Sequence, residues 1–248
     1  MLLAIDIGNT NIVCAVFDGQ DKKDQWRRET SGDIADLFDN VTDIDDVIIS
    51  SVVPRVNGDM RQLCETKLKI VPTFVDNQNA GIIIDLDKPA EVGADRLVNA
   101  VACLQHYEAP AIIVDLGTAT TFDVIDPMGR YGGGVIAPGI NLSLQALYQA
   151  AEKLPEVPVE KPEKAIGKNT KDAMQSGIYW GYIGLIEGTL NRLMEEMEAK
   201  PLVIATGGLA PLFATGTDKI DVIDGDLTLK GLVHIQSELS QKKNRKSA

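Results

Sequence analysis

The feature that most constrains this chain is a short acidic turn that occurs twice. The first copy reads LLAIDIGNTNIVCAVFDG from Leu2, and the second reads AIIVDLGTATTFDVIDP from Ala111. In each copy an apolar, β-branched run reaches Asp-x-Gly, at Asp6 and at Asp115, and a second apolar run follows the turn. Two such runs on either side of a glycine-bearing turn predict a β-hairpin.

The spacing of the two copies predicts an internal duplication. They lie about half a chain apart in a sequence of 248 residues. We therefore expect two similar α/β domains, residues 1–110 and 111–248, each long enough to bury its own core. The expected fold is a pair of ribonuclease H-like domains with mixed sheets flanked by helices. Duplicated domains of this kind commonly bind a ligand in the cleft between them.

The chemistry of the two turns points to a phosphate ligand. A carboxylate at the end of a buried strand is costly to desolvate unless a cation or ordered water faces it. The adjacent glycine lets the backbone approach a ligand, and turn N–H groups bind phosphate oxygens. Thr10 and Thr118 add hydroxyl groups. One such turn could equally be a simple Asp-capped turn, but two in matching contexts favour a site for a triphosphate and its Mg²⁺.

A third motif lies late in the chain. The stretch VIATGGLA predicts a strand that runs into a glycine turn at Gly207 and Gly208. The absence of side chains there leaves a flat backbone surface, which suits a nucleoside.

Other segments are assigned by periodicity and by turn residues. Helices are predicted over residues 56–68, 94–107 and 171–198, with Asp95 as the N-cap of the second. Strands are predicted over 46–50 and 70–76. Irregular segments are predicted over the glycine-rich 128–140, the proline-containing 155–170 and the basic tail 241–248, which we expect to be disordered.

The long helix carries four glycines on one face: Gly177, Gly181, Gly184 and Gly188. Each costs about 1 kcal/mol relative to alanine in a helix. Close approach of another helix would compensate for that cost, so this face is expected at or beside a dimer interface.

Composition narrows the function classes. The net charge of −12 makes nucleic acid an unlikely partner. Three scattered cysteines and two histidines give no zinc-binding spacing, so the thiols are expected to be reduced. No signal peptide or apolar run long enough to cross a membrane is found, which predicts a cytoplasmic protein.

Five stretches resemble the type III pantothenate kinase family, of the actin, sugar-kinase and heat-shock-chaperone ATPase superfamily. They are DIGNTN, EVGADRLVNA, DLGTATTFDVID, GGGVIAPG and TGGLA. The resemblance covers nearly the whole chain. It implies ATP-dependent phosphorylation of pantothenate to 4'-phosphopantothenate, the first step of coenzyme A synthesis, by a homodimer that uses Mg²⁺ and a monovalent cation, K⁺ or NH₄⁺.

The resemblance also implies roles for individual residues. Asp95 would be the catalytic base, Asp115 would bind the monovalent cation, and Asp6 would order Mg²⁺ through water. The ATP phosphates would lie on Asp6, Ile7, Gly8, Asn9, Thr10, Asn11, Ile12 and Val13, with Thr118, Gly207 and Gly208 contributing further nucleotide contacts. Pantothenate would contact Leu86, Gly93, Ala94, Asp95, Arg96 and, across the dimer, Thr170.

Some alternatives stay open at the level of sequence. Asp95 could serve only as a helix cap, although a cap position also leaves its carboxylate free to face a ligand. Where the family commonly carries an aromatic residue seven positions before the glycine of GADR, this chain has Leu86. Two other functions fit the same fold: a kinase for another small alcohol, and a non-catalytic nucleotide-binding regulator.

Overall fold

Two α/β units make up the computed structural model, which describes residues 1–151, 154–197 and 199–247. The first unit combines Met1–Tyr107 with Asp226–Ala248, and the second is Glu108–Gly225. Each contains one mixed five-stranded sheet with helices packed on it. The predicted class of two α/β domains with mixed sheets is therefore confirmed.

The sheet of the first unit is built around the first acidic hairpin. Its strand order is β3-β2-β1-β4-β5. β1 pairs antiparallel with β2 and parallel with β4. The strands are β1 (Leu2–Ile7), β2 (Asn11–Asp18), β3 (Asp21–Glu29), β4 (Asp46–Ser51) and β5 (Thr73–Phe74).

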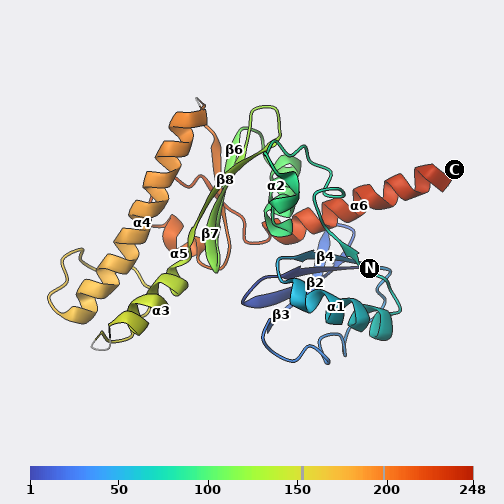
Figure 1. The fold of residues 1–248 in the computed structure, drawn as a ribbon, viewed down its shortest axis with the longest axis horizontal. Coiled ribbons are helices and arrows are strands. Elements are labelled where there is room, and N and C mark those ends of the chain that lie inside the picture. The colour runs from blue at the N-terminus through green and yellow to red at the C-terminus, as the bar shows by residue number, and fades with distance from the viewer. Residues whose placement is uncertain (152–153, 198, 248) are drawn as a thin grey trace. The chain divides into compact units, whose positions relative to one another are not determined.

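Helices cover both faces of this sheet (Figure 1). Leu3, Ile5 and Ile7 of β1 pack on the face covered by α1 (Pro54–Leu63), which continues as the π-helical turn η1 (Cys64–Leu68). The opposite face, which carries Asp6, is covered by α2 (Ala94–His106) and α6 (Leu227–Ser247). A 3₁₀ turn, η2 (Pro89–Glu91), precedes α2. The alternation of β1 thus separates an apolar face from a face with a carboxylate.

The sheet of the second unit repeats the first. Its order is β10-β9-β6-β7-β8, so β6 occupies the place of β1, with an antiparallel hairpin on one side and a parallel strand on the other. The strands are β6 (Ala111–Leu116), β7 (Ala119–Ile125), β8 (Tyr131–Pro138), β9 (Leu202–Thr206) and β10 (Val222–Ile223). The repeated strand order supports a duplicated fold.

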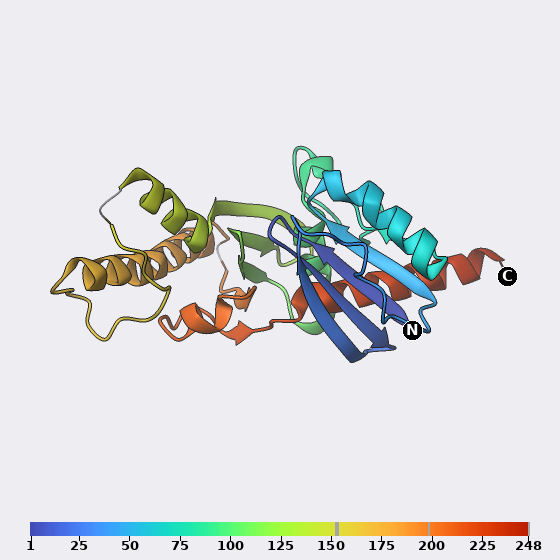
Figure 2. The same cartoon turned by 90° about the horizontal axis from the view of Figure 1, so that it is seen from below.

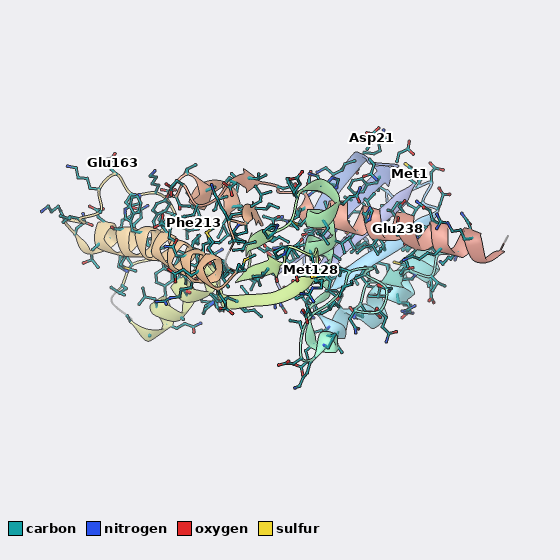
Figure 3. The ribbon with its side chains drawn as sticks, turned by 90° about the horizontal axis from the view of Figure 1, so that it is seen from above. Met1, Asp21, Met128, Glu163, Phe213 and Glu238 are labelled. Carbon is teal, nitrogen blue, oxygen red and sulfur yellow. The ribbon has the colours of Figure 1, made fainter. Side chains whose placement is uncertain are left out.

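Three helices belong to the second unit: α3 (Ile140–Ala150), α4 (Thr170–Met197) and α5 (Ala210–Ala214). Phe213 of α5 packs against the rings of Tyr179 and Tyr182 of α4. Phe213 is labelled in Figure 3. α3 and α4 lie side by side (Figure 2). An apolar groove of about 340 Å³ separates them and is lined by Ile140, Ser143, Leu144, Leu147, Met174, Gly177, Ile178, Gly181 and Tyr182.

Three segments differ from the sequence prediction. Residues 131–138 form β8 rather than a loop, because the glycine-rich backbone pairs along β7. β3 is highly charged and was not predicted; it is held by its pairing with β2. The tail expected to be disordered continues α6 through Ser247, where its basic residues favour a helix C-terminus.

The boundary between the units also differs from the expected one. α6 packs on α2, β1 and β4, so the end of the chain groups with the first unit and not with residues 111–225. Two polar contacts hold its start: Thr228 donates to Asn99 at 2.7 Å, and Lys22 contacts both carboxylate oxygens of Asp226 at 2.7 and 2.8 Å. Local composition does not predict that the chain returns to the first unit after residue 225.

The three cysteines form no disulfide, as predicted, and all three are buried. Burial raises the pKa of the Cys64 and Cys103 thiols to about 12, so both are protonated at neutral pH. Among the helices in the described ranges, none combines the length and apolarity that a bilayer crossing needs.

Candidate active site

The first acidic hairpin forms a tight turn between β1 and β2. The Gly8 N–H donates to the Asn11 carbonyl at 2.9 Å and closes the turn, which leaves Asn9 and Thr10 exposed at its tip. Ile7 and Ile12 flank the turn with side chains fully buried in the core under α1. These two residues can therefore offer a ligand only their backbone.

Asp6 lies at the end of β1 with its carboxylate half-buried. Burial raises its pKa from the ordinary 3.8 to about 7, and the nearby negative charge of Asp95 raises it further. The Ser50 hydroxyl opposes this shift. The negative charge of Asp95, on α2, thus disfavours ionisation of Asp6.

Ser50 places a second polar group beside Asp6, which suits a hydrated cation. Asp6 and Ser50 are opposite each other in the parallel pairing of β1 with β4, so both side chains point to the same face. Ser50 is fully buried, and its hydroxyl makes no hydrogen bond of ordinary geometry within the described residues. A buried hydroxyl without a hydrogen-bond partner, beside a carboxylate, is the arrangement expected where a bound ion or its water would complete the hydrogen bonding.

The segment Gly93–Arg96 begins α2. Gly93, not Asp95, is the N-cap, so the predicted cap is displaced by two residues. Asp95 lies in the first turn, where its Oδ1 accepts the Arg96 N–H at 2.8 Å. Burial raises the pKa of Asp95, while that N–H and the Arg96 charge lower it. The net rise brings the carboxylate nearer to neutral pH than an ordinary aspartate, which favours a general base.

The second acidic hairpin brings Asp115 against the glycine turn after β9. Asp115 pairs with Thr206, the last residue of β9. Gly207 follows with φ of +88°, and a Cβ there would lie 2.6 Å from Asp115 Oδ1 and 2.7 Å from the Leu116 carbonyl oxygen. Only glycine fits this position. Carboxylate and carbonyl oxygens therefore gather in a space kept free of side chains, which fits a monovalent cation.

Gly139 provides a second close approach in this unit. A Cβ on Gly139 would lie 2.2 Å from the Thr118 carbonyl oxygen and 2.6 Å from that of Gly117. The Gly139 N–H donates to the same Thr118 oxygen at 3.2 Å. The start of α3 is thus fixed against the turn that carries Thr118, whose side chain is exposed.

Not all predicted residues gather in one place within their unit. In the first unit, Asp6 lies on the face of the sheet that α2, which begins at Gly93–Arg96, helps to cover, whereas Ile12 of the 8–13 turn points to the face under α1. Leu86 is half-buried in the segment before α2. In the second unit, Asp115, Thr118 and Gly207 meet, with Gly208 exposed beside them. Thr170 is exposed at the first residue of α4, and this end of the helix projects away from the sheet (Figures 1 and 2).

Sequence reasoning missed two residues of the first unit: Ser50 and Thr30. Ser50 ends an apolar strand in the same way as Asp6, and this signal could have identified it. Thr30 follows a charged strand and bonds to the 8–11 turn, but nothing in local sequence announces a contact across 22 positions.

Comparison with known proteins assigns a family to these motifs. The family model described as type III pantothenate kinase matches residues 2–192. A relative named type III pantothenate kinase from Paramagnetospirillum magneticum is 51% identical, with 95% of this chain and 96% of the relative covered. Proteins of the same name from Rhodospirillum rubrum (52% identical, 95% and 97% covered) and Halalkalibacterium halodurans (45%, 98% and 100%) also match.

Solved structures agree on the fold. A putative Baf family transcriptional activator from Campylobacter jejuni has a TM-score of 0.64 at 20% identity, with 96% of this chain and 99% of that chain covered. The activator of a 2-hydroxyisocaproyl-CoA dehydratase from Clostridium difficile, with bound ADPNP, has a TM-score of 0.55 at 11% identity, with 100% and 97% covered. At these identities the likeness concerns the fold alone.

The pKa of Asp6 predicts a pH-dependent stability. Because the folded protein holds a proton on Asp6 up to about pH 7, against 3.8 ordinarily, this group's contribution is complete below pH 4 and is lost as pH rises through 7. The asparagine of Asp6→Asn cannot ionise and so does not lose stability in this way. Between pH 5 and pH 8 the unfolding free energy of wild type should therefore fall by on the order of 1–3 kcal/mol relative to that of Asp6→Asn. Urea unfolding at both pH values measures the difference.

Asp18→Asn, which changes an exposed carboxylate at the end of β2, is the control and should follow wild type. If wild type and Asp6→Asn show the same change in stability between the two pH values, Asp6 is not held protonated by its surroundings.

Proposed function

This chain belongs to the type III pantothenate kinase family, and from that premise we propose how its residues catalyse phosphoryl transfer. The enzyme uses ATP to phosphorylate pantothenate, as part of coenzyme A synthesis. One observation carries the assignment of residues: Asp95 lies near enough to Asp6, 89 positions earlier in the sequence, for its negative charge to raise the pKa of Asp6. Asp6 belongs to the turn proposed for ATP and Asp95 to the segment proposed for pantothenate.

Asp95 is the general base of this proposal. Its carboxylate accepts the proton of the primary hydroxyl of pantothenate as the hydroxyl oxygen attacks the γ-phosphorus of ATP, and ADP departs. The raised pKa supports this role, because a base is most effective when its pKa approaches the working pH. Its hydrogen bond from the Arg96 N–H fixes the position of one carboxylate oxygen.

Asp6 and the 8–13 turn hold the ATP phosphates. Asp6, with the buried Ser50 hydroxyl beside it, is proposed to hold the hydration shell of Mg²⁺. When bound, the ion neutralises charge on the phosphates. The exposed tip of the turn, Asn9 and Thr10, is proposed to face the phosphate oxygens. Asp115 and the carbonyl groups around Gly207 are proposed to hold the monovalent cation, with Thr118 and Gly208 near the nucleotide.

Pantothenate is proposed to bind along the start of α2. Arg96 is the only cation in Gly93–Arg96 and pairs with the substrate carboxylate. The positive N-terminus of α2, at Gly93 and Ala94, favours the same anionic group. Leu86 is proposed to contribute an apolar contact to the substrate. The cytoplasm is the proposed location.

A second copy of this chain is the proposed partner. The groove between α3 and α4 is apolar, and Leu142 and Leu147 of α3 are exposed beside it. A Cβ added to Gly177, Gly181, Gly184 or Gly188 would meet nothing within 4 Å in its own chain. The four glycines therefore gain no packing within the chain, and a partner helix supplies it. A dimer through α4 would also present Thr170 to the second copy.

Of the two rival functions, neither has an observation in its favour. The family relationship, at 45–52% identity over nearly the whole chain, supports pantothenate as the alcohol. The regulator rests on a likeness of fold only.

Replacing Asp95 tests the base. Asp95→Asn keeps the size of the side chain and removes the proton acceptor, so kcat should fall by about 10²–10⁴ while Mg·ATP affinity stays near wild type. A coupled ADP-release assay and calorimetric titration with Mg·ATP measure the two quantities. Asp76→Asn, in the loop after β5, is the control. Turnover close to wild type in Asp95→Asn would reduce Asp95 to a structural residue of the first turn.

The cation site predicts a salt-specific rate. Activity should be higher in K⁺ or NH₄⁺ than in Na⁺ at equal ionic strength, and Asp115→Asn should remove the difference by deleting the anionic ligand. Asp218→Asn, an exposed carboxylate of the same unit, should keep it. Equal wild-type rates in Na⁺ and K⁺ would contradict the assignment of Asp115.

The proposed dimer predicts a change in mass. Gly184→Leu places a bulky side chain on the open face of α4, so sedimentation should show wild-type dimers and variant monomers. Gly58→Leu, in an equally open position on α1, should leave the dimer intact. A wild-type monomer, or a Gly184→Leu dimer of unchanged stability, would rule out this face.

A further inference from the structure

Thr30 joins the end of β3 to the turn between β1 and β2. Its hydroxyl donates to the Gly8 carbonyl at 2.7 Å, and its N–H donates to the Thr10 carbonyl at 3.0 Å. The residue is buried, with 3% of its surface exposed. One residue therefore binds two carbonyl groups of a four-residue turn from the side of β3.

These two hydrogen bonds decide which polar atoms the turn presents. A carbonyl oxygen directed at a phosphate oxygen repels it, whereas N–H groups attract it. Because the Gly8 and Thr10 oxygens are directed to Thr30, they are turned away from the exposed tip at Asn9. The Gly8 N–H, bonded to the Asn11 oxygen, fixes the remaining side of the turn.

The arrangement also removes conformational freedom before a ligand binds. A turn of four residues that contains a glycine would otherwise have to be ordered when the phosphates arrive, at a cost in affinity. Thr30 holds the Gly8 and Thr10 carbonyl groups in the free protein. Its own burial beside β2 keeps its hydroxyl in one direction.

We propose that Thr30 is a positioning residue for the ATP phosphates, which acts by holding the Gly8 and Thr10 carbonyl groups away from them. The inference rests on the proposed assignment of the 8–13 turn to the phosphates. Thr30 touches neither substrate; it acts through the backbone of the turn.

Thr30→Val tests this role, since valine keeps the volume and the backbone N–H but lacks the hydroxyl. The KM for ATP and the dissociation constant for Mg·ADP, measured by calorimetry, should each rise about five- to tenfold, the loss expected for one hydrogen bond. The KM for pantothenate should change less than twofold. Thr30→Ser restores the hydroxyl and should return both nucleotide constants toward wild type.

The control is Thr66→Val, which removes the bonds of an exposed threonine hydroxyl to the Gln62 carbonyl at 2.7 Å and the Leu63 carbonyl at 3.3 Å, away from the turn. It should leave both KM values unchanged. If Thr30→Val does not fold, Thr30→Ala removes the same hydroxyl without adding a methyl group against the Gly8 oxygen, and the same shifts are expected.

Thr10→Ala separates this inference from the proposed function. Weaker Mg·ADP binding in Thr10→Ala with wild-type binding in the Thr30 variant would overturn the role of Thr30 and leave the phosphate site standing. Wild-type binding in both would overturn the phosphate site itself. An equal rise in both KM values of Thr30→Val, not rescued by serine, would show a general structural role and also overturn the inference.

Discussion

The parallel pairing of β1 with β4 is the contact on which the candidate site depends. Its register sets Asp6 opposite Ser50 on the face covered by α2 and α6, while Ile5 and Ile7 point to the other face. A shift by one residue would move the carboxylate into the apolar layer under α1. The cost of burying Asp6 beside Asp95 is therefore imposed by the same register that forms the core.

The two units surround their acidic strand ends with different groups. In the first, burial and the negative charge of Asp95 raise the pKa of Asp6, and the Ser50 hydroxyl partly opposes that rise. In the second, Asp115 faces carbonyl groups and a glycine with positive φ. The same strand order thus carries two different surroundings, to which we assign two different proposed sites, one for a hydrated divalent ion and one for a monovalent ion.

Much of this arrangement could be predicted from sequence, because its strongest elements are local. The strand–Asp-x-Gly–strand pattern identified both hairpins. Helical periodicity predicted α4 with bounds within one residue of those observed. β8 and β3 were missed because neither has strand-like composition; pairing with β7 and β2 decides their structure. The cap of α2 was misplaced because Asp95 and Gly93 both suit the start of a helix. Ser50 and Thr30 act through strands distant in sequence, which no local pattern records.

The position of α6 has a consequence for how the chain is made. The second unit is inserted into the first, between Tyr107 and Asp226, and α6 covers the face of β1 that carries Asp6. During synthesis from the N-terminus, residues 108–225 leave the ribosome complete while the first sheet still lacks one of its covering helices. The inserted unit is therefore free to fold first, and the face of β1 that carries Asp6 remains partly exposed to water until α6 has been synthesised.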